Sequence, residues 1–175
     1  MKTPKKILIP VDLSLYSMVA VQYGQEIAEL FDAEVIITHV NERERHAETT
    51  AQSPDFPEKL EPERRKRIME VIQHQLVDRN LVSRSVRIDV RFGSPVREIM
   101  KAAEELHADL IIMSTHGRTG LRHVLLGSVA EKVVRFAKCP VLTIKPEEVR
   151  ELIDLTENDV ALTLHLQDKS AETTS

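Results

Sequence analysis

The sequence is poor in cysteine and in long apolar segments, and each shortage excludes a class of protein. Cys139 is the single cysteine among 175 residues. It cannot form an intramolecular disulfide or a cysteine-based zinc cluster, and its isolation indicates a reducing compartment. No apolar run approaches the roughly 20 residues of a membrane-spanning helix, and the first residues do not form a secretory signal. We therefore expect a cytoplasmic protein.

The chain also lacks an excess of positive charge. Its 24 Lys and Arg residues are outnumbered by 28 Asp and Glu residues, for a formal net charge of −4. Without a global basic field, neither a nucleic acid nor a membrane is the expected partner. The basic run at residues 64–67 is interpreted as a solvated helix face, with nucleic-acid binding as the alternative.

Short β-branched segments alternate with segments of helical periodicity, which predicts a single α/β domain. The predicted strands are residues 7–11, 34–40, 86–92, 109–113 and 141–144. Four helices are predicted. The first has an apolar face from Val19 to Phe31 that includes Leu30, and the second runs over residues 62–79 with Val71 inward. The third begins at Ser94-Pro95, and the fourth covers residues 128–137. Strand and helix alternation makes right-handed crossovers, so the sheet should be parallel with helices on both faces. A polar loop at residues 41–60 should precede the second helix.

A separate unit is predicted after the last strand, so that residues 1–145 form the domain and residues 146–175 an acidic extension. The extension carries eight acidic and two basic residues. Residues 147–155 have a helical apolar face, and Val160, Leu162, Leu164 and Leu166 alternate with polar or small residues as in a half-buried strand. We expect a short helix followed by a strand.

Glycine is scarce, yet three of the five glycines lie between Gly117 and Gly127, directly after the fourth strand. Gly127-Ser128 opens a predicted helix, whose first N–H groups and partial positive charge suit a phosphate. The same residues also fit a capping box, in which Ser128 caps the helix and Glu131 reaches back. Both interpretations remain open from the sequence alone.

The standard motifs of nucleotide enzymes are absent. The sequence contains no G-x-x-x-x-G-K-[ST], no G-x-G-x-x-G and no G-x-S-x-G. Near the glycines there is no nucleophile with an adjacent base and no carboxylate pair for a metal, and the seven histidines have no metal-ligand spacing. We expect a binding module without catalytic residues or a bound metal site.

Several segments together resemble the universal stress protein family. They are the first strand with Asp12, His39-Val40 after the second strand, Gly93-Ser94-Pro95, residues 108–113, the glycine stretch ending in Gly127-Ser128, and Cys139-Pro140. The resemblance covers about residues 5–145, and the order and spacing of so many pieces make it specific. It implies an open, Rossmann-like sheet of five parallel strands in the order 3-2-1-4-5.

One branch of that family binds ATP and carries G-x-x-G, nine residues, and then G-[ST]. Here Ser114 replaces the first glycine, where its side chain would either narrow the nucleotide site or donate to a phosphate. The cofactor implied by the resemblance is ATP, with or without Mg. The residues implied to bind it are Pro10, Val11, Asp12, Val40, Met113, Ser114, His116, Gly117, Arg118, Gly120, Gly127, Ser128 and Val129.

The implied strand order supports the same location, because ligands of open α/β sheets bind where neighbouring strands have connections leaving in opposite directions. By resemblance, Asp12 and Val40 face the ribose and the adenine, Pro10 shapes the floor, and Gly117, Gly127, Ser128 and Val129 hold the phosphates. Alternatives are open for single residues: Asp12 caps the first helix or its turn, Val40 belongs to the core, His116 is structural, and Arg118 lies in solvent.

We expect a cytoplasmic stress-response module that binds ATP and signals by occupancy or conformation. The alternatives are an interaction module that has lost nucleotide binding through Ser114, and an enzyme of nucleotidyl-transfer or slow ATPase type. The resemblance also implies a homodimer through the edge strand at residues 141–144, whose unpaired backbone groups invite a partner. The strand predicted in the extension could modify that pairing.

Overall fold

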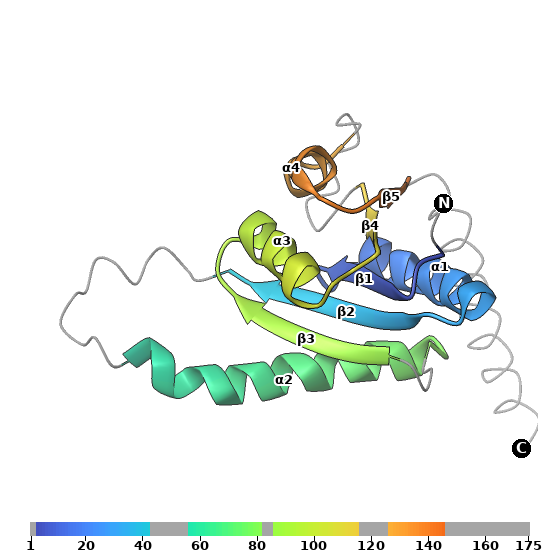
Figure 1. The fold of residues 1–175 in the computed structure, drawn as a ribbon. Coiled ribbons are helices and arrows are strands. Elements are labelled where there is room, and N and C mark those ends of the chain that lie inside the picture. The colour runs from blue at the N-terminus through green and yellow to red at the C-terminus, as the bar shows by residue number, and fades with distance from the viewer. Residues whose placement is uncertain (1–2, 43–55, 82–85, 116–125, 146–175) are drawn as a thin grey trace, which may run out of the picture.

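The computed structural model describes residues 3–42, 56–81, 86–115 and 126–145, with the side chains of residues 56–60 excepted. Strands and helices alternate along this part of the chain (Figure 1). The strands are β1 (Lys6–Val11), β2 (Glu34–Asn41), β3 (Val86–Phe92), β4 (Leu110–Ser114) and β5 (Val141–Ile144). The helices are α1 (Leu15–Phe31), α2 (Phe56–Asp78), α3 (Pro95–Glu105) and α4 (Ser128–Phe136).

The five strands form one sheet in the order β3-β2-β1-β4-β5, and every neighbouring pair is parallel. The fold class and strand order predicted from the sequence are therefore confirmed. The carboxyl ends of all five strands lie at the same edge of the sheet. The connections from β1 and β4 leave in opposite directions, which places a topological switch point between these two strands.

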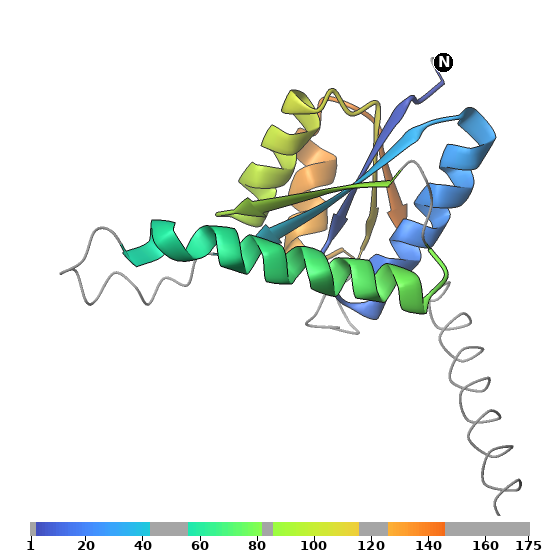
Figure 2. The ribbon, with the colours of Figure 1, turned by 90° about the horizontal axis from the view of Figure 1, so that it is seen from below.

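The two faces of the sheet carry separate hydrophobic cores because strand side chains alternate between faces. Ile7 and Ile9 of β1 pack with α1 and α2, whereas Leu8 packs with α3 and α4. Figures 1 and 2 show α1 and α2 on one side of the sheet and α3 and α4 on the other. Burial on both faces explains why β1 and β2 read as continuous apolar runs.

Two features of the helices differ from the prediction. Helix α2 begins at Phe56, six residues before the expected start, and contains Pro62 in its interior. The expected loop at residues 41–60 is correspondingly shorter. Leu30, Phe31 and Val71 were expected to face inward but are 79%, 40% and 45% exposed. Leu30 follows the buried Ala28 by two residues, which places it about 200° around the helix from that buried side chain. Phe31 is the last residue of α1 and is only partly covered.

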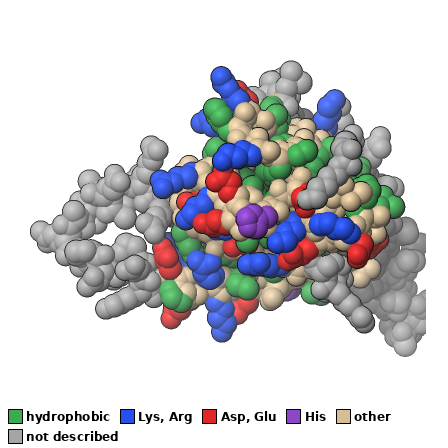
Figure 3. Space-filling model, viewed as in Figure 1, with side chains coloured by type: hydrophobic (Ala, Val, Ile, Leu, Met, Phe, Trp, Pro, Cys, Tyr) green, Lys and Arg blue, Asp and Glu red, His purple; other side chains and the backbone are tan. Residues whose placement is uncertain are grey.

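The acidic extension at residues 146–175, with its predicted helix and strand, lies outside the described residues. Within the described segments, none of the helices combines the length and the hydrophobicity that crossing a bilayer requires. Basic and acidic side chains are interspersed over the face seen in Figure 3. On α2, Lys66 forms an ion pair with Glu70 one turn later, as expected of a solvated helix face.

Candidate functional site

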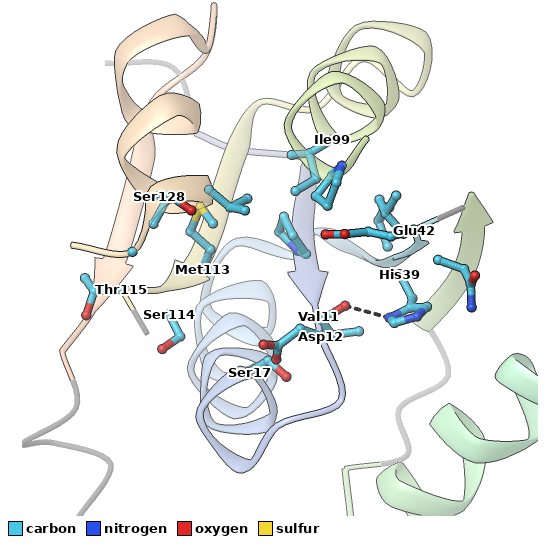
Figure 4. A pocket seen from close by; sticks show the side chains of 18 residues that line it. Val11, Asp12, Ser17, His39, Glu42, Ile99, Met113, Ser114, Thr115 and Ser128 are labelled. Atoms are coloured by element: carbon cyan, nitrogen blue, oxygen red, sulfur yellow. Dashed lines mark hydrogen bonds between the residues drawn. The ribbon is translucent and has the colours of Figure 1, made fainter. Parts of the chain in front are cut away.

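A cleft of about 630 Å³ opens at the carboxyl edge of the sheet, between the ends of β1, β2 and β4 and the first turns of α3 and α4 (Figure 4). This volume lies within the range of roughly 300–1,000 Å³ found for small-molecule sites. The structure places nine of the predicted site residues in its lining: Pro10, Val11, Asp12, Val40, Met113, Ser114, Gly127, Ser128 and Val129. The sequence prediction and the cleft therefore coincide over three strands and a helix.

The other four predicted residues, His116, Gly117, Arg118 and Gly120, lie outside the described residues. The lining also includes residues that the sequence prediction did not select, namely Ser17, Thr38, His39, Asn41, Glu42, Pro95, Ile99, Thr115 and Ala130. Most of them directly adjoin a predicted residue or begin a helix. They could have been predicted by selecting every residue at the carboxyl end of a parallel strand or at the start of the helix that follows it.

Asp12 stands at the exit of β1, where its carboxylate is oriented by the start of α1. Its Oδ1 accepts hydrogen bonds from the Ser14 backbone N–H, at 3.1 Å, and from the Ser14 hydroxyl, at 2.5 Å. Ser14 is the N-cap of α1 and accepts from the Ser17 N–H. The interpretation of Asp12 as the cap of the first helix is therefore wrong, because Ser14 is the N-cap. Asp12 does cap the turn that precedes the helix, since it accepts from the Ser14 N–H.

His39 ties the ends of the two central strands together. Its Nδ1 lies 2.8 Å from the carbonyl oxygen of Val11, and the side chain is buried in the cleft lining (Figure 4). A carbonyl oxygen only accepts, so Nδ1 carries the proton in this hydrogen bond. The bond fixes the backbone immediately before Asp12 relative to β2.

The opposite wall of the cleft is the beginning of α4. The N–H of Gly127 donates to the Thr115 carbonyl at 2.7 Å, and the first helical bond runs from the Glu131 N–H to the Gly127 carbonyl at 2.9 Å. Gly127 is the N-cap and no side chain caps the helix. The predicted capping box is therefore wrong: Ser128 is already inside the helix. Ser128, Val129 and Ala130 of the first turn line this end of the cleft, and N–H groups in a first turn have no acceptor within the helix.

Ser114 and Thr115 carry the chain from β4 into this wall. Both are buried, at 8% and 4% exposure. Thr115 is anchored to β5, because its backbone N–H and its hydroxyl both donate to the Ile144 carbonyl, at 2.9 and 3.2 Å. Ser114 lines the cleft with ordinary negative-φ backbone. A serine is therefore accommodated at this position without backbone strain.

The third side of the cleft is more apolar. Pro95 and Ile99 of α3 and Val40 of β2 line it, and Glu42 lies between Ile99 and His39 (Figure 4). Pro95 occupies the first position of α3, where its missing N–H is not needed, and Ser94 precedes it without a side-chain cap. Val40 is only half-buried and lines the cleft, so it is not simply a core residue.

Charge is distributed unevenly around the cleft. Among the described lining residues the charged groups are Asp12 and Glu42, both acidic. Partial positive charge comes from the starts of α3 and α4, which both border the cleft, at about half a unit charge for each helix. The described residues hold no cluster of three metal-ligating side chains. Cys139 is not in the lining, and burial, with a smaller contribution from the Asp109 charge, raises the pKa of its thiol.

Comparisons with known proteins agree with this geometry. The sequence model of the universal stress protein family matches residues 3–145. Universal stress protein MJ0531 of Methanocaldococcus jannaschii is 36% identical over 142 residues, which are 81% of this chain and 82% of the relative. MJ0577 of the same organism is 35% identical in an alignment of 156 residues that covers 81% of this chain and 94% of the relative.

Solved structures share the fold. The structure of MJ0577 superposes with a TM-score of 0.67 at 32% identity, over 82% of this chain and 97% of that chain. A universal stress protein crystallised in complex with cAMP superposes with a TM-score of 0.59 at 23% identity, over 82% of this chain and 98% of that chain.

Proposed function

Since the chain belongs to the universal stress protein family, we propose that its cleft binds an adenine nucleotide, ATP in the first instance. The protein then acts in the cytoplasm as a stress-response module whose nucleotide occupancy is the signal. The observation that carries this proposal is the pairing of the Asp12 carboxylate with the start of α4 across one cleft at the switch point of the sheet.

Each part of the nucleotide has a matching wall. The apolar surfaces of Val40, Pro95 and Ile99 suit the base. The Asp12 carboxylate, an acceptor already oriented by Ser14, suits the ribose hydroxyls. The N–H groups of the first turn of α4, at Ser128 and Val129, suit the phosphates.

Mg would accompany the phosphates, since Mg²⁺ bound with a nucleotide takes most of its ligands from phosphate and water and needs no cluster of protein carboxylates. Titrating ATP in the presence of EDTA and of excess Mg separates the two cases. Equal affinities would show that the protein recognises the phosphates directly, and a loss in EDTA would show that it recognises the Mg complex.

Nucleotide binding is tested by isothermal titration of the purified protein with ATP, ADP, cAMP and GTP, and by analysis of nucleotides released on heating. ATP should bind and GTP should bind more weakly. Absence of heat at millimolar ATP, together with no released nucleotide, would reject the proposal. It would favour the interaction module, for which the buried Ser114 side chain in the cleft is the specific observation.

We also propose a homodimer through β5 and α4. The outer edge of β5 has backbone groups without a strand partner in the described sheet. Beside it Val134, Phe136 and Leu142 are 45%, 57% and 39% exposed. An apolar surface next to an open strand edge is a site for pairing with a second copy. Sedimentation equilibrium of the full chain tests the dimer, and of residues 1–145 tests whether the extension modifies it.

A further inference from the structure

The backbone on both sides of Asp12 is held by side chains from other elements. On one side the His39 Nδ1–H donates to the Val11 carbonyl at 2.8 Å. On the other side the Gln75 Nε2–H donates to the Leu13 carbonyl at 3.3 Å. His39 comes from β2 and Gln75 from α2, the helix on the face of the sheet away from α3 and α4. Asp12 itself is thus bracketed by two long-range hydrogen bonds.

The segment needs such restraint because Leu13 has a φ of +67°, in the left-handed region that residues with a side chain rarely adopt. A left-handed Leu persists only where its surroundings hold it. The Leu13 side chain packs against the core and its carbonyl accepts from Gln75. The turn that aims the Asp12 carboxylate is therefore maintained by contacts and not by its own backbone preference.

Gln75 is placed in a way that stability alone does not explain. Its Oε1 is buried and has no hydrogen-bond partner among the described residues. A buried, unpaired acceptor is unfavourable, and an apolar side chain of similar length would avoid it. The orientation of the amide is set by the bond that it does form, because turning it over would place two oxygens together. What the glutamine supplies is the single donor to Leu13.

We propose that Gln75, together with His39, is a positioning residue that holds Asp12 for contact with the ribose hydroxyls of the nucleotide. This inference rests on the proposed function of the cleft. Neither side chain needs to touch the hydroxyls, since each acts through the backbone flanking Asp12. It follows that α2 contributes to nucleotide recognition through one hydrogen bond, the bond from Gln75 to the Leu13 carbonyl.

The test is Gln75→Met, which keeps the length of the side chain and removes both the donor and the unpaired acceptor. Affinities are measured by titration with ATP and with 2′,3′-dideoxy-ATP, which lacks the hydroxyls that Asp12 would bind. We expect the dissociation constant for ATP to rise about tenfold, the equivalent of one hydrogen bond, and that for dideoxy-ATP to stay unchanged. Gln73→Met, an exposed position on the same helix, is the matched control and should alter neither.

The outcomes separate this inference from the function on which it rests. If the wild-type protein binds neither nucleotide, the proposed function fails. If it binds both equally, Asp12 does not recognise the hydroxyls and the inference is overturned while nucleotide binding stands. If Gln75→Met weakens both ligands equally, the residue is merely structural and the inference is again overturned.

A double-mutant cycle gives a second measurement. In an Asp12→Ala background, Gln75→Met should cause no further loss of ATP affinity, because its effect passes through Asp12. A full additional loss would contradict the inference. Should Gln75→Met be poorly folded by thermal melting, His39→Phe removes the other flanking bond and must show the same selective loss for ATP over dideoxy-ATP.

Discussion

Replacing Gly127 with valine should separate recognition of the phosphates from recognition of the nucleoside. A Cβ at this position would lie 3.0 Å from the Thr115 carbonyl oxygen. The Gly127 N–H donates to the same oxygen at 2.7 Å, so the carbonyl cannot move away without breaking that bond. Gly127 has a φ of −63°, and its requirement is therefore the close approach and not an unusual backbone conformation.

The size of the effect follows from these contacts. The backbone must give by a few tenths of an ångström, and the β-branched methyl groups of valine add to the displacement. Overpacking of this kind destabilises a fold by about 1–3 kcal/mol. A hydrogen bond to a charged group contributes about 1.5–3 kcal/mol, and each 1.4 kcal/mol is a tenfold change in affinity. Misplacing one N–H at the start of α4 should weaken ATP binding by about tenfold or more.

The assay is titration of Gly127→Val with ATP and with adenosine, after thermal melting has shown that the variant is folded. ATP affinity should fall while adenosine affinity stays within about twofold of wild type, since adenosine has no phosphates. Ala137→Val, at the other end of α4, controls for a general loss of stability and should affect neither ligand. Equal losses for ATP and adenosine, or unchanged ATP affinity, would refute the placement of the phosphates at this helix.

Three further changes test other parts of the structure. Gly93→Ala should lower the free energy of unfolding by about 1–3 kcal/mol in urea titrations, because Gly93 has a φ of +142°; unchanged stability would contradict that backbone conformation. Leu142→Arg should convert the proposed dimer to a monomer in sedimentation equilibrium, and a dimer that persists would argue against the β5 edge as its interface. The hydrogen bond from Arg91 lowers the pKa of Glu105 below its ordinary value of 4.5. The stabilisation that Glu105 provides is therefore complete above about pH 4.5 and is lost as the pH falls through the lower folded pKa. Glu105→Gln should thus have a flatter stability profile below pH 4.5 than wild type, and parallel profiles would argue against the ion pair.

The sheet could be predicted because its physical signals are local. A strand buried on both faces must be apolar throughout, and β1 and β2 satisfy this without help from distant residues. The ends of the helices could not be predicted in the same way. Leu30 was assigned to the apolar face because of its residue type, yet it lies off the buried face of α1, and Phe31 is half covered because the helix ends there.

The candidate site was predictable where it depends on residue type and position after a strand. Asp12 and Gly127 were indicated on those grounds, whereas Ser114 was selected only through the resemblance to the family; all three line the cleft. The contribution of His39 was not predictable, since its bond to Val11 joins residues 28 positions apart and depends on the pairing of β1 with β2. The capping box failed because the helix begins one residue earlier than the pattern implied, with Gly127 as the cap and Ser128 as the first helical residue.

The two walls of the cleft are built on opposite principles. At Gly127 the wall depends on the absence of a side chain, because the backbone of α4 must approach Thr115 closely. At Asp12 it depends on the presence of side chains, because Leu13 is left-handed without being glycine and is held by Gln75. In the sequence, a glycine indicates a wall of the Gly127 kind, whereas no neighbouring residue type indicates a wall of the Asp12 kind. A sequence search that looks for glycines therefore finds the proposed phosphate wall. It overlooks the proposed ribose wall, although both walls would bind the same ligand.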